Sequence, residues 1–452
     1  MGRTRPVRLL FPRVGLWRGA MDSGEAKAAR EVREARGANR EEAPRNVAGP
    51  GSGGAHGMGV SRPKAAAVAC LRGLLNVWYR LCRAVLPRRN QVLLLSRQSD
   101  EPSYDFQVLA GQFRARGFSA VVMAKRLSRK NALAYGLFAL RQTACLAQSR
   151  LCVIDGYNPV VSLLSLDVAP DAGQIDARRA DPVVIQIWHA FGAFKAFGRQ
   201  STDTAENCSG QTADLLRMHK NYSWAVCSGE RCREAYAQAF GMPIERVVAK
   251  ERPWCFKLKR LGEARKAKPS HAGGPRGILF APTLRKNPDS PRPLSELYEA
   301  GAWRRLEDGG AATVIWSFHP LERKGRAGAS TLDALMTSDL LVTDYSSVVF
   351  EACLLGVPTL FYVPDIDRYR RSPGLNADPA TLCPNLCFTD EAALLEALEG
   401  FASGTWDYPW DEYRRFGASA FDESDAPDDA LADFAASRLD GGRTMDDGPC
   451  KA

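Results

Sequence analysis

Two histidines occupy matching positions after apolar segments, and both could take part in acid–base chemistry. His189 follows the segment PVVIQIW, and His319 follows ATVIWSF. Such runs are typical of buried strands, and parallel α/β sheets bind ligands at the carboxyl ends of their strands. A neutral imidazole at that edge can accept a proton near neutral pH. A single histidine there is more often a hydrogen-bonded core side chain, but the matched pair favours catalysis.

The segment TDYSS combines a strand end with a helix start. Thr343 and Asp344 end an apolar strand, and Ser346 and Ser347 open the helix that follows. A helix N-terminus offers free N–H groups and positive potential, so the segment predicts a phosphate site. Glu351, one turn into the helix, could accept the hydroxyls of a ribose. The alternative is an ordinary capping serine with a glutamate that complements the helix dipole.

Further polar side chains follow other strands of the same kind. Lys195 lies in the glycine-containing loop beyond His189, and Thr283 and Arg285 follow the apolar run GILFA. An arginine at a strand end can bind a phosphate with two parallel hydrogen bonds. The alternative is a surface arginine with no ligand.

These residues need sheets to hold them, and the sequence alternates between strand-like and helix-like segments. Apolar runs predict strands at 91–96, 118–124, 151–155, 182–188, 222–228, 245–250, 277–283, 312–320, 339–347 and 358–364. Helical periodicity is expected at 104–116, 131–149, 208–219, 229–240, 294–306, 331–337, 348–355 and, last, 390–401. The alternation indicates an α/β fold of two Rossmann-like domains, each with a parallel sheet, facing across a cleft.

The predicted domains leave segments at both ends and between the halves. We expect a disordered basic leader at 1–64, a basic amphipathic helix at 65–90, domains at 91–250 and 277–420, a polar linker at 251–276 and an acidic tail at 421–452. The formal net charge is +10, and its excess lies before residue 91. A nearly neutral body argues against nucleic-acid binding and favours a local contact with anionic lipid.

Helix 65–86 carries leucines and Trp78 on one side and arginines on the other. This pattern suits a membrane surface, and it equally suits a helix packed on its own domain. No uncharged apolar stretch is long enough to span a bilayer, and the arginine-rich start makes a poor secretory signal. The twelve cysteines are scattered without metal-ligand spacing, so we expect reduced thiols, no structural metal and no cofactor.

The motifs together resemble the CDP-glycerol glycerophosphotransferase family of teichoic acid synthesis. The resemblance rests on Trp188-His189-Ala190 with Lys195, on Ala281-Pro282-Thr283-Leu284-Arg285, on His319-Pro320, and on Thr343-Asp344-Tyr345-Ser346-Ser347 with Glu351 and Pro358. Order and spacing agree over roughly 90–400. The sequence departs from the family at Ala190, where a glycine is usual, and at the junction Glu251–Phe256, where only Pro253 of the usual motif remains.

The resemblance implies a two-domain GT-B fold and an enzyme that needs no metal. It would transfer glycerol phosphate, or another polyol phosphate, from its CDP ester to a lipid-linked or polymeric acceptor and release CMP. His189 would be the base, with His319, Arg285, Ser346 and Ser347 at the pyrophosphate and Glu351 at the ribose. Lys195, Thr283, Thr343 and Asp344 would contact substrate. We expect a peripheral enzyme at the cytoplasmic face of the membrane, held there by residues 65–90.

Two other functions remain open from the sequence. The lost junction motif is compatible with a GT-B enzyme that uses a nucleotide sugar. It is also compatible with a non-catalytic relative that binds a nucleotide or a membrane. The retained histidines and TDYSS segment favour the phosphotransferase.

Overall fold

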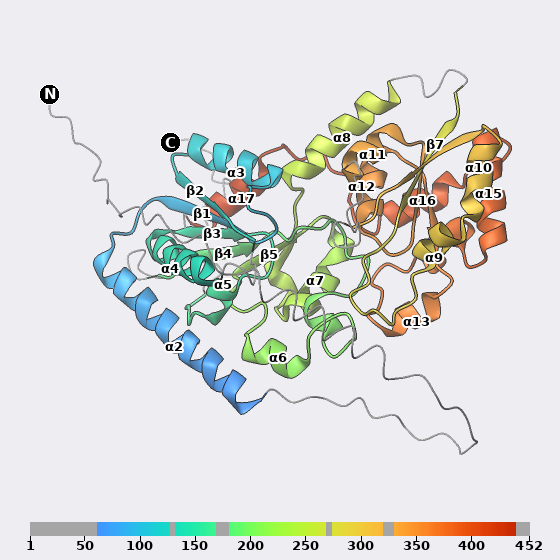
Figure 1. Cartoon of the computed structure of the whole chain (residues 1–452). Coiled ribbons are helices and arrows are strands. Elements are labelled where there is room, and N and C mark those ends of the chain that lie inside the picture. Colours follow the sequence, from blue (N-terminus) through green and yellow to red (C-terminus); the bar gives the residue numbers. More distant parts are fainter. Residues whose placement is uncertain (1–60, 127–131, 169–179, 268–273, 320–329, 440–452) are drawn as a thin grey trace, which may run out of the picture. The chain divides into compact units, whose positions relative to one another are not determined.

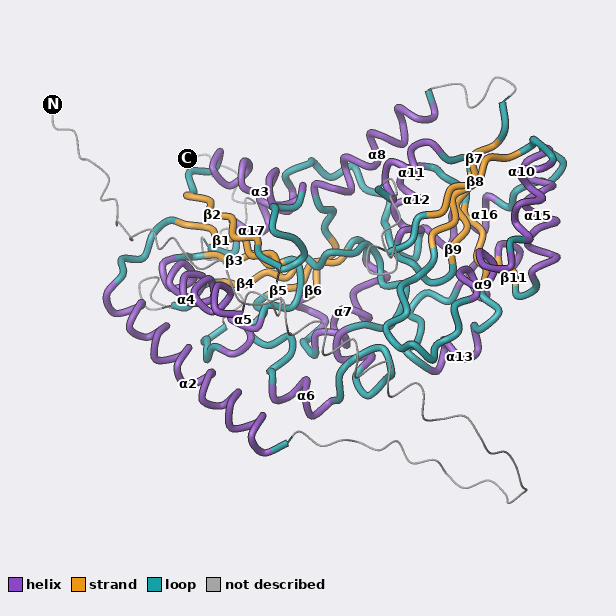
Figure 2. The backbone as a smooth tube through the Cα atoms, viewed as in Figure 1, coloured by secondary structure: helices purple, strands orange, loops and turns teal. Residues whose placement is uncertain are grey.

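The computed structural model describes residues 61–126, 132–168, 180–267, 274–319 and 330–439, which form two parallel sheets (Figures 1 and 2). The first sheet has the order β2-β1-β3-β4-β5-β6. Its strands are β1 (Gln91–Ser96), β2 (Ser119–Ala124), β3 (Leu151–Ile154), β4 (Val183–Gln186), β5 (Trp224–Cys227) and β6 (Val247–Ala249). The order is that of a doubly wound fold, as the sequence predicts.

Helices cover both faces of the first sheet, so its central strands are apolar throughout. In β1, Leu93 and Leu95 belong to one core cluster and Val92 and Leu94 to the other. The first cluster includes side chains of α2 (Arg62–Val85), α4 (Ala132–Gln148), α5 (Pro159–Leu163) and α7 (Arg233–Phe240). The second includes α3 (Tyr104–Ala115) and α17 (Ala430–Ser437), which lie on the opposite side of the sheet in Figure 1.

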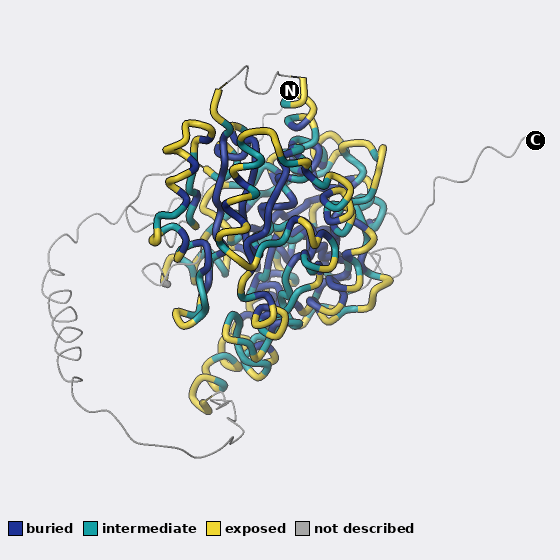
Figure 3. Tube along the Cα trace, turned by 90° about the vertical axis from the view of Figure 1, so that its right-hand side faces the viewer, coloured by how far each residue is buried: buried dark blue, intermediate teal, exposed yellow. Residues whose placement is uncertain are grey.

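The second sheet has the order β11-β10-β9-β7-β8. Its strands are β7 (Arg276–Ala281), β8 (Ala312–Trp316), β9 (Leu340–Thr343), β10 (Thr359–Tyr362) and β11 (Cys387–Phe388). Its helices are α9 (Pro293–Ala300), α10 (Arg305–Asp308), α11 (Thr331–Thr337), α12 (Val348–Leu355), α13 (Ile366–Arg371), α14 (Pro379–Leu382), α15 (Glu391–Ser403) and α16 (Trp410–Gly417). Figure 3 shows that the buried residues gather inside these layers. The two-sheet α/β architecture predicted from the sequence is confirmed.

Several predicted segments differ from the structure. The segment 251–276 is not a plain linker, because Pro253–Lys266 forms helix α8, which packs on α12 through Gly262. The helix predicted at 208–219 is only α6 (Gly210–Leu215), since positive φ angles at Arg217 and His219 end it. The helix predicted at 294–306 breaks at Gly301, where φ is 77°.

The segment predicted as an acidic tail also contains ordered structure. After α16 the chain returns to the first sheet, where Leu431 and Ala435 of α17 enter the core. Arg116 of α3 pairs with Asp429 and Asp433 at 2.7 and 2.5 Å. The predicted tail 421–452 is therefore docked on the first domain up to residue 439, and residues 440–452 lie outside the described residues. The same holds for 1–60 of the predicted leader.

Candidate active site

His189 lies in the loop that leaves β4, and the residue before it has an unusual backbone conformation. Trp188 has a φ of 55°, in the left-handed region that residues other than glycine rarely adopt. Its amide donates to Oε1 of Gln186 at 2.8 Å, and Nη1 of Arg252 donates to its carbonyl oxygen at 2.9 Å. These two bonds hold the turn that brings His189 into a cavity at the carboxyl end of the sheet.

The ring of His189 is positioned through Nδ1. This nitrogen lies 3.3 Å from the carbonyl oxygen of Asp155 and 3.2 Å from Nε2 of Gln98. When Nδ1 carries the proton, it donates to the Asp155 carbonyl and leaves the lone pair of Nε2 available; the Gln98 amide donates to Nδ1 only in the other tautomer. His189 is exposed to solvent in the cavity, but neighbouring protein groups still desolvate its ring in part. Burial, and then the charge of Arg252, lower the pKa of His189 to about 4. The imidazole is therefore neutral at pH 7.

Arg252 belongs to the degenerate junction, and it connects both halves of the chain to the His189 loop. Its guanidinium pairs with Asp105 at 3.0 Å, with both side chains less than a tenth exposed. Asp105 also accepts the amide N–H of Trp254 at 2.7 Å. The indole of Trp254 then donates to Glu351 on α12 at 3.3 Å. The junction thus links α3, the His189 loop and the helix that carries Glu351.

The loop that follows His189 is fixed in the core of the second half. Phe191 and Phe194 belong to the second sheet's cluster, where Phe194 contacts Tyr345 with ring centroids 6.3 Å apart. Gly192 lies between them with φ 59°, and a Cβ there would come within 2.4 Å of the Phe350 ring. Only glycine fits this position. Two apolar side chains from one half therefore position the loop against the other half.

Lys195 ends this loop and pairs through its backbone with Leu375. Burial lowers the pKa of its ammonium group, while the nearby Asp344 opposes that change. Within the described chain, no side chain forms an ion pair with the Lys195 ammonium. The charge is thus available to an anionic ligand.

The second half contributes the start of α12. Ser346 and Ser347 are half-buried at its N-terminus, and Glu351 lies one turn on. Burial raises the pKa of Glu351, whereas its hydrogen bond from Trp254 lowers it. The α12 N-terminus presents N–H groups and positive potential to the cavity.

One cavity of about 480 Å³ brings most of the predicted residues together. It is lined by His189, Lys195, Thr283, His319, Ser346, Ser347 and Glu351 among others. His189 and His319 thus face a common space from opposite sheets, as their matched positions predict. Pro320, the second residue of the His-Pro motif, lies outside the described residues.

Arg285, Thr343 and Asp344 do not line this cavity, so their predicted contact with substrate needs correction. The Arg285 side chain is 4% exposed and pairs with Asp344 at 2.9 Å and with Asp365 at 3.2 Å. Asp344 also accepts the Thr283 amide at 2.8 Å. Thr343 donates its hydroxyl to the Ala281 carbonyl at 2.7 Å. Apart from Nε of Arg285, which has no hydrogen-bond partner among the described residues, their polar side-chain groups already bond to the protein, so these side chains support the cavity wall from behind.

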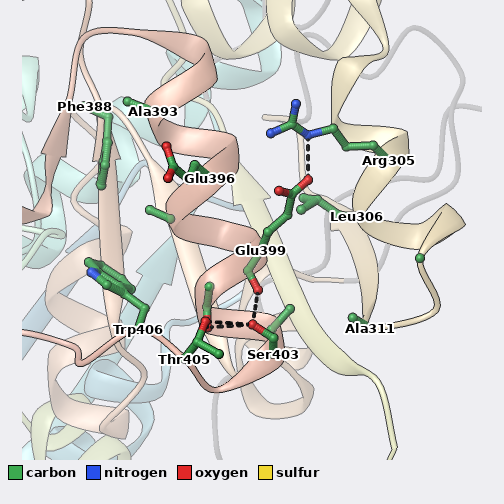
Figure 4. A pocket seen from close by; sticks show the side chains of 14 residues that line it. Arg305, Leu306, Ala311, Phe388, Ala393, Glu396, Glu399, Ser403, Thr405 and Trp406 are labelled. Carbon is green, nitrogen blue, oxygen red and sulfur yellow. Dashed lines mark hydrogen bonds and ion pairs between the residues drawn. The ribbon is translucent and has the colours of Figure 1, made fainter.

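A larger cavity of about 830 Å³ lies elsewhere, between α10 and α15 (Figure 4). Arg305 and Glu399 pair across it at 2.8 Å. None of the residues predicted from the sequence lines it, and its charged side chains, Arg305, Glu396 and Glu399, carry an excess of negative charge that does not suit a phosphate ligand. We therefore place the active site in the smaller cavity.

Sequence reasoning missed the supporting residues. Gln98, Asp105 and Asp155 follow the carboxyl ends of strands or begin a helix, which was a usable signal. Burial raises the pKa of the Asp155 carboxyl to about 6. For Arg252, the one sequence feature that indicated a structural role is its position just before the proline that opens α8.

Comparison with known proteins identifies similar enzymes. Residues 77–426 match the model of the family described as CDP-Glycerol:Poly(glycerophosphate) glycerophosphotransferase. A teichoic acid ribitol-phosphate primase of Bacillus spizizenii is 26% identical over 356 residues, which cover 73% of this chain and 87% of that protein. A teichoic acid glycerol-phosphate primase of the same species is 25% identical over 270 residues, covering 56% and 66%.

Solved structures support the fold. A variant of the wall teichoic acid polymerase TagF superposes with a TM-score of 0.54 at 15% identity, covering 84% of this chain and 98% of that chain. At this identity the match concerns the fold alone.

Proposed function

Because residues 77–426 match its family model, the chain belongs to the CDP-glycerol:poly(glycerophosphate) glycerophosphotransferase family, and we propose how its cavity transfers a polyol phosphate. The chain is a transferase of teichoic acid synthesis that uses a CDP-polyol as donor. The observation that supports a catalytic site is the convergence of His189, His319 and the start of α12 on one cavity. CDP-glycerol is the donor that we propose, with other CDP-polyols as alternatives.

The reaction needs a base and a site for the leaving group. The acceptor hydroxyl oxygen attacks the phosphorus that carries the polyol, and its proton moves to Nε2 of His189. The bond from that phosphorus to the CMP oxygen breaks, and its electron pair leaves with CMP. The protein mainly positions the reactants and stabilises charge. Ser346, Ser347 and His319 bind the pyrophosphate.

The remaining predicted residues take supporting roles. Glu351 accepts the hydroxyls of the cytidine ribose from its position on α12. Thr283 lines the cavity, but its hydroxyl and amide bond to Asp344. Arg285, Thr343 and Asp344 position this wall and do not themselves touch the substrate. The acceptor is a lipid-linked polyol phosphate or its polymer.

CMP release tests this assignment. The full chain is incubated with CDP-glycerol or CDP-ribitol and a lipid-linked polyol-phosphate acceptor. His189→Ala and His319→Ala should each lower kcat at least about 100-fold, the usual range for loss of acid–base or charge-stabilising groups. His271→Ala, between α8 and β7, serves as the matched control, and melting temperatures establish that each variant is folded.

Other results of this experiment would favour the competing functions. Stabilisation by UDP- or GDP-sugars, without CMP release from any CDP-polyol, would indicate a glycosyltransferase. Nucleotide binding without any turnover would indicate a non-catalytic relative. Wild-type rates in both histidine variants would refute the assigned roles.

We further propose that α2 and α4 form a membrane-binding surface. Leu75, Tyr79 and Cys82 of α2 pack on the first domain. The neighbouring apolar side chains point away from it: Leu71, Leu74, Val77, Trp78, Leu81 and Val85 are exposed, and so are Leu133, Leu137 and Leu140 of α4. The Trp78 indole joins the helices by donating to the Leu140 carbonyl at 3.0 Å. Helix α2 therefore packs on the first domain through one apolar stripe and contributes a second, exposed stripe to this surface.

The exposed apolar side chains change which groups we expect to attach the protein to a membrane. Arg83 donates to the carbonyl oxygens of Ala147 and Ala180 at 3.3 and 3.1 Å, and Arg88 also donates to Ala180. These two charges therefore serve the fold, whereas Arg72 and Arg80 are exposed. Apolar insertion supplies more of the binding energy than the arginines do. In the described part of the chain, no helix is long and apolar enough to cross a bilayer.

A further inference from the structure

A second cavity of about 340 Å³ adjoins the one that binds the donor. The two cavities share Trp188, His189, Lys195, Phe197, Leu284 and Lys286. The α12 N-terminus, His319 and Glu351 line only the first, while Tyr157, Met218 and His219 line only the second. The catalytic base therefore lies where two separate spaces meet.

The transfer chemistry assigns different reactants to these spaces. In phosphoryl transfer, the attacking and leaving oxygens lie roughly in line on opposite sides of the phosphorus. CMP leaves toward Ser346 and Ser347 in the first cavity. His189 must contact the attacking hydroxyl, so that hydroxyl arrives from the opposite side. The second cavity reaches His189, and no residue of α12 lines it.

The charge at the shared wall suits an anionic acceptor. Lys195 and Lys286 both line it. Glu206 is the acidic residue among the lining side chains, and the second half already engages its oxygens. Its Oε2 accepts the Lys286 amide at 3.0 Å, and its Oε1 accepts the Ser290 hydroxyl at 3.3 Å. Two ammonium groups against one carboxylate leave an excess of positive charge, and Nζ of Lys286 also donates to the Glu206 carbonyl oxygen at 3.3 Å. This excess favours a phosphodiester, and the volume suits a short ligand segment better than a folded polymer.

The backbone around this cavity is strained in an unusual way. Among the described residues, every non-glycine position with a positive φ falls between 188 and 221: Trp188, Asp203, Arg217, His219 and Asn221. Two of these residues, Trp188 and His219, line the second cavity. Such conformations are unfavourable for residues other than glycine and persist where the surroundings impose them, often at ligand sites. Gly198 in the same wall admits no side chain, since a Cβ would lie 2.4 Å from the Ala239 carbonyl oxygen.

We propose that the second cavity binds the terminal polyol phosphate of the acceptor, with Lys195 and Lys286 at its phosphodiester and its free hydroxyl at His189. This inference rests on the proposed transfer reaction. It specifies that the acceptor is recognised by its last phosphate as well as by its hydroxyl. The wall formed by Tyr157, Met218 and His219 holds the polyol.

Filling the cavity from Met218 tests the proposal. Met218→Cys is treated with methanethiosulfonates of increasing size, and wild type receives the same reagents as a control for native cysteines. The KM for the acceptor should rise at least about tenfold with the largest reagent. The KM for the CDP-polyol should stay within about twofold. A rise in the donor KM alone, or no change in either, would overturn the assignment.

A binding experiment separates this inference from the proposed reaction. Glycerol 3-phosphate is titrated into the full chain by calorimetry, with glycerol as the matched phosphate-free probe. Glycerol 3-phosphate should bind at least about tenfold more tightly, and the largest reagent on Met218→Cys should abolish its binding. Equal binding of both probes, or binding that survives the modification, would refute the site even if CMP release succeeds. Absence of CMP release with specific binding would instead refute the reaction alone.

Discussion

The protonation state of His189 gives a quantitative prediction about activity. Burial and the charge of Arg252 lower its pKa to about 4, from an ordinary value of about 6.5. At pH 5.5 a base with a pKa of about 4 is about 97% neutral, whereas one with a pKa of about 6.5 is about 9% neutral. Activity that depends on the neutral ring should therefore remain nearly constant from pH 7.5 to pH 5.5. An ordinary histidine would lose about tenfold over the same interval.

The perturbation is Arg252→Gln, which removes the charge but keeps a donor for the Trp188 carbonyl. The His189 pKa should rise toward 6.5. The pH below which kcat/KM falls should therefore rise as well. Lys259→Gln is the matched control, because Lys259 pairs with Glu251 at 2.5 Å in the same junction. This substitution also removes one positive charge, from α8, and should leave the pH dependence of kcat/KM unchanged.

The assay combines pH–rate profiles with NMR titration of the imidazole, whose resonance is assigned by its loss in His189→Gln. The same shift predicts a stability effect with a defined sign. The unfolded chain binds the proton between pH 6.5 and about 4 and the folded chain does not, so His189 destabilises the fold as pH falls through this window. The reasoning would be refuted if kcat/KM of the wild type fell near pH 6.5, or if it fell at the same pH in the wild type and in Arg252→Gln.

Two further predictions concern the membrane surface and the buried ion-pair network. Leu74→Asp with Leu137→Asp should weaken binding to anionic vesicles at least about tenfold in a flotation assay, because tenfold corresponds to about 1.4 kcal/mol and losing even one fully inserted leucine costs about 1.5–3 kcal/mol; a larger loss from Arg72→Gln with Arg80→Gln would contradict apolar insertion. Arg285→Met should destabilise the protein by about 3–5 kcal/mol in denaturant unfolding, because it leaves Asp344 and Asp365 buried without a counter-charge. The exposed Arg368→Met is its control, and normal stability with a raised KM for the CDP-polyol would indicate direct substrate contact instead.

Local patterns were sufficient to predict the architecture and the chemical groups. Buried parallel strands require continuous apolar runs, and helices require a repeating apolar stripe, so both elements are evident from neighbouring residues. The positions of His189 and His319 after strands place them at one edge of their sheets. The same reasoning placed Ser346, Ser347 and Glu351 on the helix after β9.

Tertiary structure decided what each polar group contacts. Arg285 could bind a phosphate or a carboxylate, and nothing in its neighbours indicates that Asp365 lies beside it. Arg252 and Asp105 are 147 positions apart, yet their pair holds the turn before the base. The exposed and the packed apolar residues of α2 recur at the same helical spacing, so the sequence alone does not distinguish them. The packing of α2 against α4 decides which of them are buried. The sequence by itself determined which reactive groups are present and at which sheet edges. The long-range packing of charges and aromatic rings decided which of them face a ligand, because burial and pairing depend on residues far apart in the chain.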